Sequence, residues 1–432
     1  MSSILYVFRE RLGDYQCVGV LHSSETHGEA YFVYDPEYLA LETSSAISLA
    51  LPLQSDSFSI KETRTFFEGL LPEGELRNYV ATSLRVNIDA FADFLVRLNN
   101  ESIGALVFCT ERSGPSNTGG YETFTADDLT NLAKQPLREA YAATMHSRLS
   151  LAGAQTKIGL YSTLGAAESS DNPLSGWYLP QGLAASTHII KTPSEVFPLQ
   201  TINEAFCLLV AGRCGFTVPD ITLIAIENSE PLLAVQRFDR VFAASTVAQG
   251  LQVPQRLHQE DMAQAAGIPT HFKYEPTDGH YLSLVAHVIN RATAYPLEDR
   301  FTFFDRILFD YLIGNCDNHL KNYSLLYSSD WQTCALAPVY DVTCTTFYPE
   351  LAIEMGISLC ASRRITDVAE TDIRNSAQKV GIPETIAWSR YQKLRQQLPQ
   401  AIYSVQKELE QTFPQVSEIA ESVTASLADK VA

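Results

Sequence analysis

The sequence predicts an α+β fold with two lobes, in which a β-rich first part and a mixed lobe precede a helical lobe. Three observations support this prediction. Residues 1–53 alternate β-branched or aromatic runs with turn residues, as short strands do. Residues 187–193 and 232–236 are strand-like apolar runs that flank a helical pattern. From Leu257 onward the apolar residues recur mostly at helical spacing.

Composition limits the class of protein. The 432 residues are 46% hydrophobic, which is enough for a substantial core and for two or three domains. With 31 basic and 50 acidic residues the net charge is −19, which argues against an unaided DNA-binding surface but allows one basic patch or a basic partner. We find neither a membrane-length apolar run nor a signal peptide. The eight cysteines lack C-x2-C spacing, so we expect reduced thiols in a cytoplasmic protein without a membrane partner.

The chain divides into three expected domains. Residues 1–112 form a β-rich domain, residues 121–240 a mixed lobe, and residues 241–432 an all-helical lobe. The Ser-, Gly- and Pro-containing stretch at residues 113–120 is the clearest linker. The first domain lacks residues suited to catalysis, so we interpret it as an interaction or scaffold module.

Local patterns predict the elements of these domains. In the first domain we expect strands at residues 4–8, 17–21, 30–34 and 103–108, and a helical stretch that begins at Phe66. In the last domain, acids in the first turn and a glycine at the end predict a helix over residues 259–267. Later helices are expected at residues 281–294, 301–313 and 384–397, followed by an amphipathic stretch from Pro399.

A polar loop at residues 314–322 lies between two apolar elements. Residues 305–313 place apolar side chains on one helical face, and Gly314 predicts the end of that helix. Residues 323–327 follow as a short strand. A polar loop held between a buried helix and a strand is a rigid place for chemistry.

The content of this loop is specific. Asp317 and Asn322 have the D-x4-N spacing with which a kinase loop supplies a base and a metal-binding amide. Asp341 follows a second apolar run and could hold a metal that bridges nucleotide phosphates, while Lys321 could neutralise the transferred phosphoryl group. The alternative is an Asx-rich turn, which is the more common explanation of this spacing when it stands alone.

Three further stretches could contact a nucleotide. Small residues around Gly153 would let backbone N–H groups approach phosphate oxygens, with Lys157 adding charge, although an ordinary hairpin turn is an alternative. Lys191 ends a buried strand and could contact phosphates and pair with Glu204 of the next helix; a solvated lysine is the alternative. Residues 232–240 fall where a kinase presents its hinge to adenine.

Within that last stretch, Arg237 and Asp239 could equally form a structural ion pair. The sequence is thus compatible both with a contact to adenine and with an ion pair at these residues.

Six stretches, in this order, resemble consecutive motifs of the HipA toxin kinases, the toxin half of the HipBA toxin–antitoxin system. They are residues 150–157, 187–191, 237–240, 256–262, 317–322 and 340–341. The match extends from about Ser150 to Asp341, and the N-terminal part has the length and strand character of the family's first subdomain.

The resemblance implies a bilobal protein-kinase-like fold and a serine/threonine protein kinase that uses ATP and Mg²⁺. Carried over by position, Asp317 is the catalytic base with Lys321 beside it, and Asn322 and Asp341 are the metal ligands. The implied nucleotide-binding residues are Ala152, Gly153, Ala154, Gln155, Thr156, Lys157, Lys191, Gln236, Arg237, Phe238, His319, Asn322 and Asp341.

The resemblance also implies regulation. Ser150 matches the serine that the family autophosphorylates to inactivate itself, and the added charge should repel a phosphate-binding loop. Ser147 is a nearby competitor for this role. Two residues depart from the family pattern: Asn318 stands where a glycine is usual, and Gln236 where a glutamate is frequent.

The implied partners are a HipB-type helix-turn-helix antitoxin dimer and operator DNA, bound mainly through that antitoxin. The implied substrate is an aminoacyl-tRNA synthetase, glutamyl-tRNA synthetase, whose inhibition produces persistence. A basic cluster at residues 362–364 could touch DNA or be a solvated turn. The other hypothesis for the whole chain is a catalytically silent co-repressor that binds antitoxin and DNA.

Overall fold

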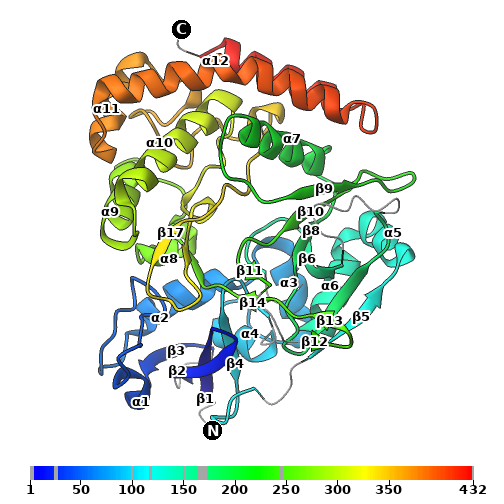
Figure 1. The fold of residues 1–432 in the computed structure, drawn as a ribbon, viewed down its shortest axis with the longest axis vertical. Helices are drawn as coiled ribbons and strands as arrows, with labels where there is room; N and C mark the ends of the chain where they lie inside the picture. The colour runs from blue at the N-terminus through cyan, green and yellow to red at the C-terminus, as the bar shows by residue number, and fades with distance from the viewer. Residues whose placement is uncertain are drawn as a thin grey trace. The chain divides into compact units, whose positions relative to one another are not determined.

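The computed structural model describes residues 4–23, 28–98, 101–115, 119–148, 151–163, 173–242 and 247–430. The chain forms two compact units, each of which is described by itself (Figure 1). Unit 1 comprises Met1–Ser194, Asp220–Glu260 and Leu326–Gln332, and unit 2 comprises Glu195–Pro219, Asp261–Leu325 and Thr333–Ala432. Sheets dominate unit 1 and helices dominate unit 2, so the predicted α+β class is confirmed.

The first sheet of unit 1 is antiparallel with the order β3-β2-β1-β4. Its strands are β1 (Ile4–Arg11), β2 (Asp14–Ser23), β3 (Ala30–Tyr34) and β4 (Leu106–Cys109). The helices beside it are α1 (Pro36–Leu39), α2 (Ile60–Phe67), α3 (Gly74–Leu84) and α4 (Phe91–Arg97), with the 3₁₀ turn η1 (Glu68–Leu70). Buried aromatic side chains such as Phe32, Phe66 and Phe94 fill the core between them.

The four predicted strands of this part are confirmed, but the start predicted for the helical stretch was wrong. Ser59 begins α2 with a capping box, in which its hydroxyl accepts a hydrogen bond from the Glu62 N–H (3.2 Å). The helix ends near Phe67, where the prediction had placed its beginning.

The second sheet of unit 1 has the order β5-β7-β6-β8-β10-β9. Its strands are β5 (Gly120–Phe124), β6 (Lys157–Ser162), β7 (Trp177–Gln181), β8 (His188–Lys191), β9 (Ile221–Ile224) and β10 (Leu232–Gln236). Helices α5 (Ala126–Lys134) and α6 (Pro136–Ser147) cover one face of this sheet (Figure 1). Leu129 and Leu132 of α5 pack into the same core as Ile158 and Leu160 of β6.

After β10 the chain forms very short strands. They are β11 (Arg240–Val241), β12 (Val247–Ala248), β13 (Leu251–Gln252), β14 (Gln255–Arg256) and β15 (Gln259–Asp261). The pairing of Arg240 with Arg256 in β11 and β14 places two arginines side by side in unit 1.

Unit 2 is built around α10 (Pro296–Ile313), which packs against α9 (Tyr281–Ala292), α12 (Glu384–Leu409) and α13 (Val416–Ala428). Figure 1 shows α12 as the long helix near the C-terminus. The other helical segments are α7 (Gln200–Arg213), α8 (Met262–Ala265), α11 (Glu370–Val380), η2 (Thr270–Phe272), η3 (Leu320–Asn322), η4 (Thr345–Phe347) and η5 (Ile365–Asp367). The predicted short strand after the polar loop is confirmed as β16 (Ser324–Tyr327).

Three details of the helical lobe correct the sequence analysis. The lobe is not all-helical, because β16 and β17 (Cys334–Leu336) are strands. The helix predicted over residues 259–267 is shorter, because Gln259–Asp261 is a strand and Asp261 caps the four-residue helix α8. The Asp261 carboxylate accepts a hydrogen bond from the Gln264 N–H (2.8 Å), so Asp261 is the N-cap of α8 and not an interior residue of a helix.

The third correction concerns Pro399. We predicted that the helix from Glu384 ends at Gln397, but α12 continues through Pro399 to Leu409. An interior proline costs about 3 kcal/mol. Buried Leu394, Leu398 and Val405 continue the apolar stripe across that position, and each contributes about 1.5–3 kcal/mol. Burial therefore outweighs the local penalty.

Within the described residues, no helix has both the length and the apolar character needed to cross a bilayer. No disulfide joins any of the eight cysteines, all of which lie among the described residues.

Candidate active site

The polar loop begins where α10 ends, at Gly314. Gly314 has φ +82°, in the left-handed region, and its N–H donates to the Asp310 carbonyl. A Cβ at this position would overlap Thr346 Oγ1 and lie 2.9 Å from Ser426 Oγ. Only glycine satisfies both conditions, so the predicted helix end is confirmed, and it fixes the point from which the loop departs.

Hydrogen bonds within the loop hold its main chain. The Asn315 amide nitrogen donates to buried Asp310 (2.9 Å), and its amide oxygen accepts from the Asp317 N–H (3.0 Å). The Asn322 amide nitrogen donates to the Asp317 carbonyl (2.6 Å). The loop therefore contains Asx-type bonds, as the alternative interpretation expected. The Asp317 side chain, unlike the main chain of the loop, is not held by these bonds, and 52% of its surface is exposed.

Two residues linked to this loop have oxygen atoms suited to a cation. Asn322 uses its amide nitrogen to hold Asp317, so its amide oxygen is the atom that could coordinate a metal. The Tyr340 hydroxyl donates to the Lys321 carbonyl (2.8 Å), which ties Asp341, the next residue, to the loop. Carboxylate and amide oxygens are ligands that Mg²⁺ accepts. These two residues therefore fit Mg²⁺.

Two ligands are too few for a site made by protein alone. Among the described residues there is no cluster of three or more His, Cys, Asp or Glu side chains that could hold a metal. Mg²⁺ usually keeps several waters and binds substrate phosphates through one or two protein groups. Asn322 and Asp341 together would supply two such groups.

Lys321 and His319 are buried in the same loop. Lys321 is 8% exposed, and its ammonium nitrogen lies 3.6 Å from Asp261 Oδ2. Burial lowers the pKa of His319 to about 4, so this imidazole is neutral at pH 7. Its ring packs edge-on against Tyr274, with centroids 5.0 Å apart. Unit 2 thus brings together the predicted residues Asp317, His319, Lys321, Asn322 and Asp341.

In unit 1, residues 151–156, for which we predicted phosphate binding, form a loop that leads into β6 at Lys157, while Ser150 lies outside the described residues. Gly153 has φ +102°, and a Cβ there would lie 2.6 Å from the Lys157 ammonium nitrogen. The ammonium group therefore lies over the bare backbone of Gly153. The Gln155 side-chain nitrogen is buried and finds no hydrogen-bond partner in the described parts of the chain. Such donors fit an anionic ligand.

Ala152, Ala154 and Thr156 complete this loop. Its main chain is fixed on two sides, because the Gly153 carbonyl accepts from the Glu73 N–H (3.1 Å) and the Thr156 carbonyl from the Thr192 N–H (3.2 Å). A fixed loop is a better phosphate cradle than a mobile one.

Lys191 lies directly opposite Lys157. The antiparallel register of β6 and β8 pairs these two residues; Lys191 is 5% exposed and Lys157 is 8% exposed. Like charges placed opposite each other destabilise a sheet. The positive charge concentrated at these strand ends suits the phosphates of a nucleotide.

The segment expected near adenine leaves the end of β10. Gln236 ends that strand, and Phe238 is half-buried. The Arg237 side chain is buried in a bidentate pair with Asp239, with distances of 2.9 and 2.8 Å. The ion-pair interpretation thus describes the Arg237 side chain, and its contact with a nucleotide would have to come from its main chain.

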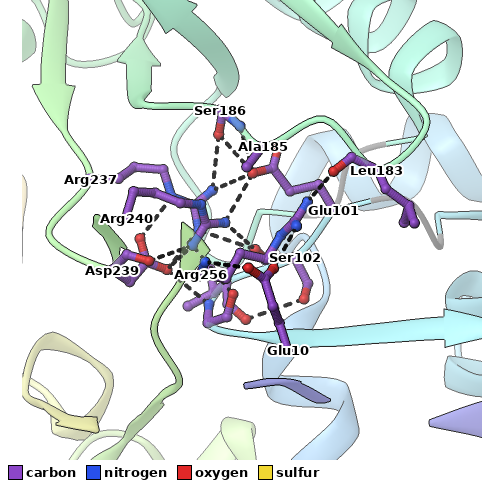
Figure 2. A network of polar contacts seen from close by, with 12 residues as sticks. Glu10, Glu101, Ser102, Leu183, Ala185, Ser186, Arg237, Asp239, Arg240 and Arg256 are labelled. Carbon is purple, nitrogen blue, oxygen red and sulfur yellow. Dashed lines mark hydrogen bonds and ion pairs between the residues drawn. The ribbon is translucent and has the colours of Figure 1, made fainter. Parts of the chain in front are cut away.

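Figure 2 shows that this pair belongs to a larger buried network of unit 1. Three arginines and three carboxylates share it: Glu10, Glu101, Arg237, Asp239, Arg240 and Arg256. Glu101 Oε1 lies 3.0 Å from Arg240 Nη2 and accepts hydrogen bonds from the Ser186 N–H (2.8 Å) and hydroxyl (3.0 Å). Arg256 pairs with Glu10 at 3.0 Å. The charges balance, which is the condition for burying them.

Two stretches of the chain match known protein domains. Residues 149–402 match the HipA-like C-terminal domain, and residues 12–109 match the HipA N-terminal domain. The chain belongs to the HipA family. A "Putative kinase Y4mE" from Sinorhizobium fredii is 34% identical over 356 residues, which cover 81% of this chain and 80% of the relative.

Two further relatives come from Shewanella oneidensis. Its "Serine/threonine-protein kinase toxin HipA" is 23% identical over 83% of this chain and 80% of the relative. A solved complex of HipA, HipB and operator DNA has the same fold as this chain, with a TM-score of 0.78 at 22% identity, over 98% of this chain and 96% of that one. The chain is thus a HipA-type protein kinase.

Sequence reasoning missed two groups of residues in this chain. The network of Glu10, Glu101, Arg240 and Arg256 was missed, because these residues come from separate segments and meet only in the folded unit, although Arg240 and Arg256 lie in two of the motif-like stretches. Tyr274, whose hydroxyl donates to Asp317 Oδ1, also escaped notice. A lone tyrosine 43 residues before its partner has no distinguishing pattern in a sequence.

Proposed function

We propose that the chain is the serine/threonine kinase toxin of a toxin–antitoxin module and acts with ATP and Mg²⁺. The observation that carries the proposal is the geometry at Asp317. Its carboxylate is half exposed on a loop whose backbone Asn322 holds at 2.6 Å. A general base needs this combination of a fixed position and access to the acceptor.

Each predicted residue has a role that its surroundings support. Asp317 would take the proton of a serine or threonine hydroxyl while the hydroxyl oxygen bonds to the γ-phosphorus of ATP. The bond between that phosphorus and the ADP oxygen would break in the same step. Lys321, held 3.6 Å from Asp261, would sit beside the developing charge. Asn322 and Asp341 would hold Mg²⁺, which neutralises phosphate charge when bound.

In unit 1, the loop from Ala152 to Lys157 would bind nucleotide phosphates, together with Lys191. The direct pairing of Lys157 with Lys191 across β6 and β8 supports this role. Gln236 and Phe238 would border the adenine.

We also propose that Ser150 is the autophosphorylated residue. Its competitor Ser147 lies inside α6, is 3% exposed and donates its hydroxyl to the Ala143 carbonyl (2.8 Å). A buried, bonded hydroxyl in a helix is a poor acceptor of a phosphoryl group. This favours Ser150.

The partners proposed are a HipB-type antitoxin dimer and, mainly through it, operator DNA. The solved relative was obtained with HipB and its operator DNA, and the −19 net charge of this chain suits contact with a basic DNA-binding partner. Direct DNA contact by residues 362–364 is less well supported, because the Arg363 guanidinium donates to the Glu275 carbonyl of its own unit. An aminoacyl-tRNA synthetase, glutamyl-tRNA synthetase, is the proposed substrate.

The test is intact-mass analysis and phosphopeptide mapping after incubation with Mg-ATP, beside Asp317→Asn. We expect a phosphate at Ser150 in the unmodified chain and none in the variant. ATP binding without any phosphate incorporation would contradict the kinase proposal and leave the co-repressor role. A phosphate at Ser147 would overturn only the assignment of the modified serine.

A further inference from the structure

Tyr274 reaches the proposed catalytic base from outside the loop. Its hydroxyl donates a hydrogen bond to Asp317 Oδ1. Both side chains are accessible, with 46% of Tyr274 and 52% of Asp317 exposed. Asp317 thus meets in its own unit a hydroxyl donor, the chemical group that it would meet in a serine or threonine substrate.

The backbone on the N-terminal side of Tyr274 is fixed to the catalytic loop. The Lys273 carbonyl accepts from the Leu320 N–H (3.1 Å), which lies three residues after Asp317. The preceding turn η2 is also held, because the Phe272 carbonyl accepts from the Tyr281 hydroxyl (2.6 Å). The tyrosine and the carboxylate are therefore mounted on the same scaffold.

The backbone on the C-terminal side is fixed by Glu275. Its N–H donates to the Gly356 carbonyl (2.8 Å), and its carboxylate, 5% exposed, accepts from the N–H groups of Tyr281 and Ser358, both at 2.8 Å. A buried carboxylate that accepts main-chain N–H groups from two segments is costly to displace. The segment that carries Tyr274 is therefore not built as a mobile gate.

We propose that Tyr274 is a positioning residue for phosphoryl transfer, which holds one carboxylate oxygen of Asp317 so that the other faces the acceptor hydroxyl. This inference rests on the proposed function, in which Asp317 is the base. The physical reason is orientation. A carboxylate turns easily about its last bond, and one charge-assisted hydrogen bond selects a single rotation. The edge-on contact with His319 restricts the tyrosine ring in turn.

The experiment compares Tyr274→Phe with the unmodified chain. The rate of phosphate incorporation into the chain is followed by intact mass as a function of Mg-ATP concentration. We expect the maximal rate to fall about tenfold, while the half-saturating ATP concentration stays within about twofold, since a general base contributes about 10²–10⁴-fold and the variant loses only its orientation. ATP affinity measured by calorimetry and the melting temperature should be unchanged.

Tyr403→Phe is the matched control, because Tyr403 is also exposed (56%) and lies in the same unit on α12. It should behave as the unmodified chain does. A Tyr274→Phe rate equal to or above the original would overturn the proposal, and an increase would instead mean that Tyr274 competes with the substrate. A fall in rate accompanied by lower ATP affinity and a lower melting temperature would also overturn it, since it would indicate a structural role.

The variant Asp317→Asn distinguishes failure of the proposed function from failure of the inference about Tyr274. If that variant still incorporates phosphate, the proposed function fails and this inference with it. If it is inactive while Tyr274→Phe keeps the full rate, only the inference fails.

Discussion

Replacing Asp239 by asparagine tests the buried network of unit 1 at its most connected carboxylate. Asp239 Oδ1 accepts from Arg237 Nε at 2.9 Å. Asp239 Oδ2 accepts from Arg237 Nη2, the Gly104 N–H and Gln259 Nε2 at 2.8, 2.9 and 3.1 Å, and lies 2.9 Å from Arg240 Nη1. Whichever way the new amide is turned, its NH₂ group faces a donor. The variant keeps the shape, loses the charge, and loses the hydrogen bonds that were accepted by whichever oxygen the NH₂ group replaces.

The expected loss of stability follows from burial. Asp239 is 2% exposed, and removing one partner of a buried ion pair costs about 3–5 kcal/mol. For a unit of this size, 1 kcal/mol shifts the melting temperature by about 2–4 °C, so Asp239→Asn should melt roughly 6–20 °C lower. Differential scanning calorimetry measures this shift directly.

The control makes the same chemical change on the surface of the same unit. Asp56→Asn alters an exposed carboxylate and should stay within about 0.5 kcal/mol of the unmodified chain. If Asp239→Asn melted within 2 °C of the unmodified protein, the reasoning that the network is both buried and charge-balanced would be refuted.

Two further predictions concern other parts of the chain. Burial lowers the pKa of His258 to about 3, while in the unfolded chain it is near 6.5, so the unfolded state binds the extra proton first and stability falls as pH drops below about 6.5. In urea titrations, His258→Gln should make the loss of folding stability between pH 6.5 and 4.5 shallower. Part of the loss should remain, because burial also lowers the pKa values of His188 and His319 to about 4. An unchanged dependence of stability on pH would contradict the assignment of this loss to His258. Gly314→Ala should destabilise unit 2 by about 1–3 kcal/mol more than Gly215→Ala, because both glycines have positive φ but only Gly314 also meets neighbouring side chains. Equal melting temperatures of the two variants would show that the contact is relieved without cost.

The parts that sequence reasoning predicted are those that are continuous in the chain. Asp317 and Asn322 lie on one short loop, and Gly314 ends α10 for a reason that a single residue type expresses. The strands of the first sheet carry their own apolar runs. Local patterns sufficed for these features.

The features that sequence reasoning missed depend on contacts between distant segments. Glu101 meets Arg240 across 139 residues, and no window of the sequence contains both. The helix through Pro399 was missed because burial on the opposite face of α12 outweighs a local rule. The strand at Gln259–Asp261 was missed because an acidic stretch before a glycine fits a helix start equally well.

The buried network limits which N-terminal domains could be joined to the C-terminal region of this chain. The stretch that matches the HipA N-terminal domain ends at residue 109, so it carries Glu101, whereas Arg237 and Arg240 belong to the stretch that matches the C-terminal domain. A chimera that joined this C-terminal region to an N-terminal domain with a neutral residue at position 101 would bury an unbalanced arginine. In this chain the two matched stretches therefore share one buried network within unit 1, so their boundary in sequence does not separate independent folding units.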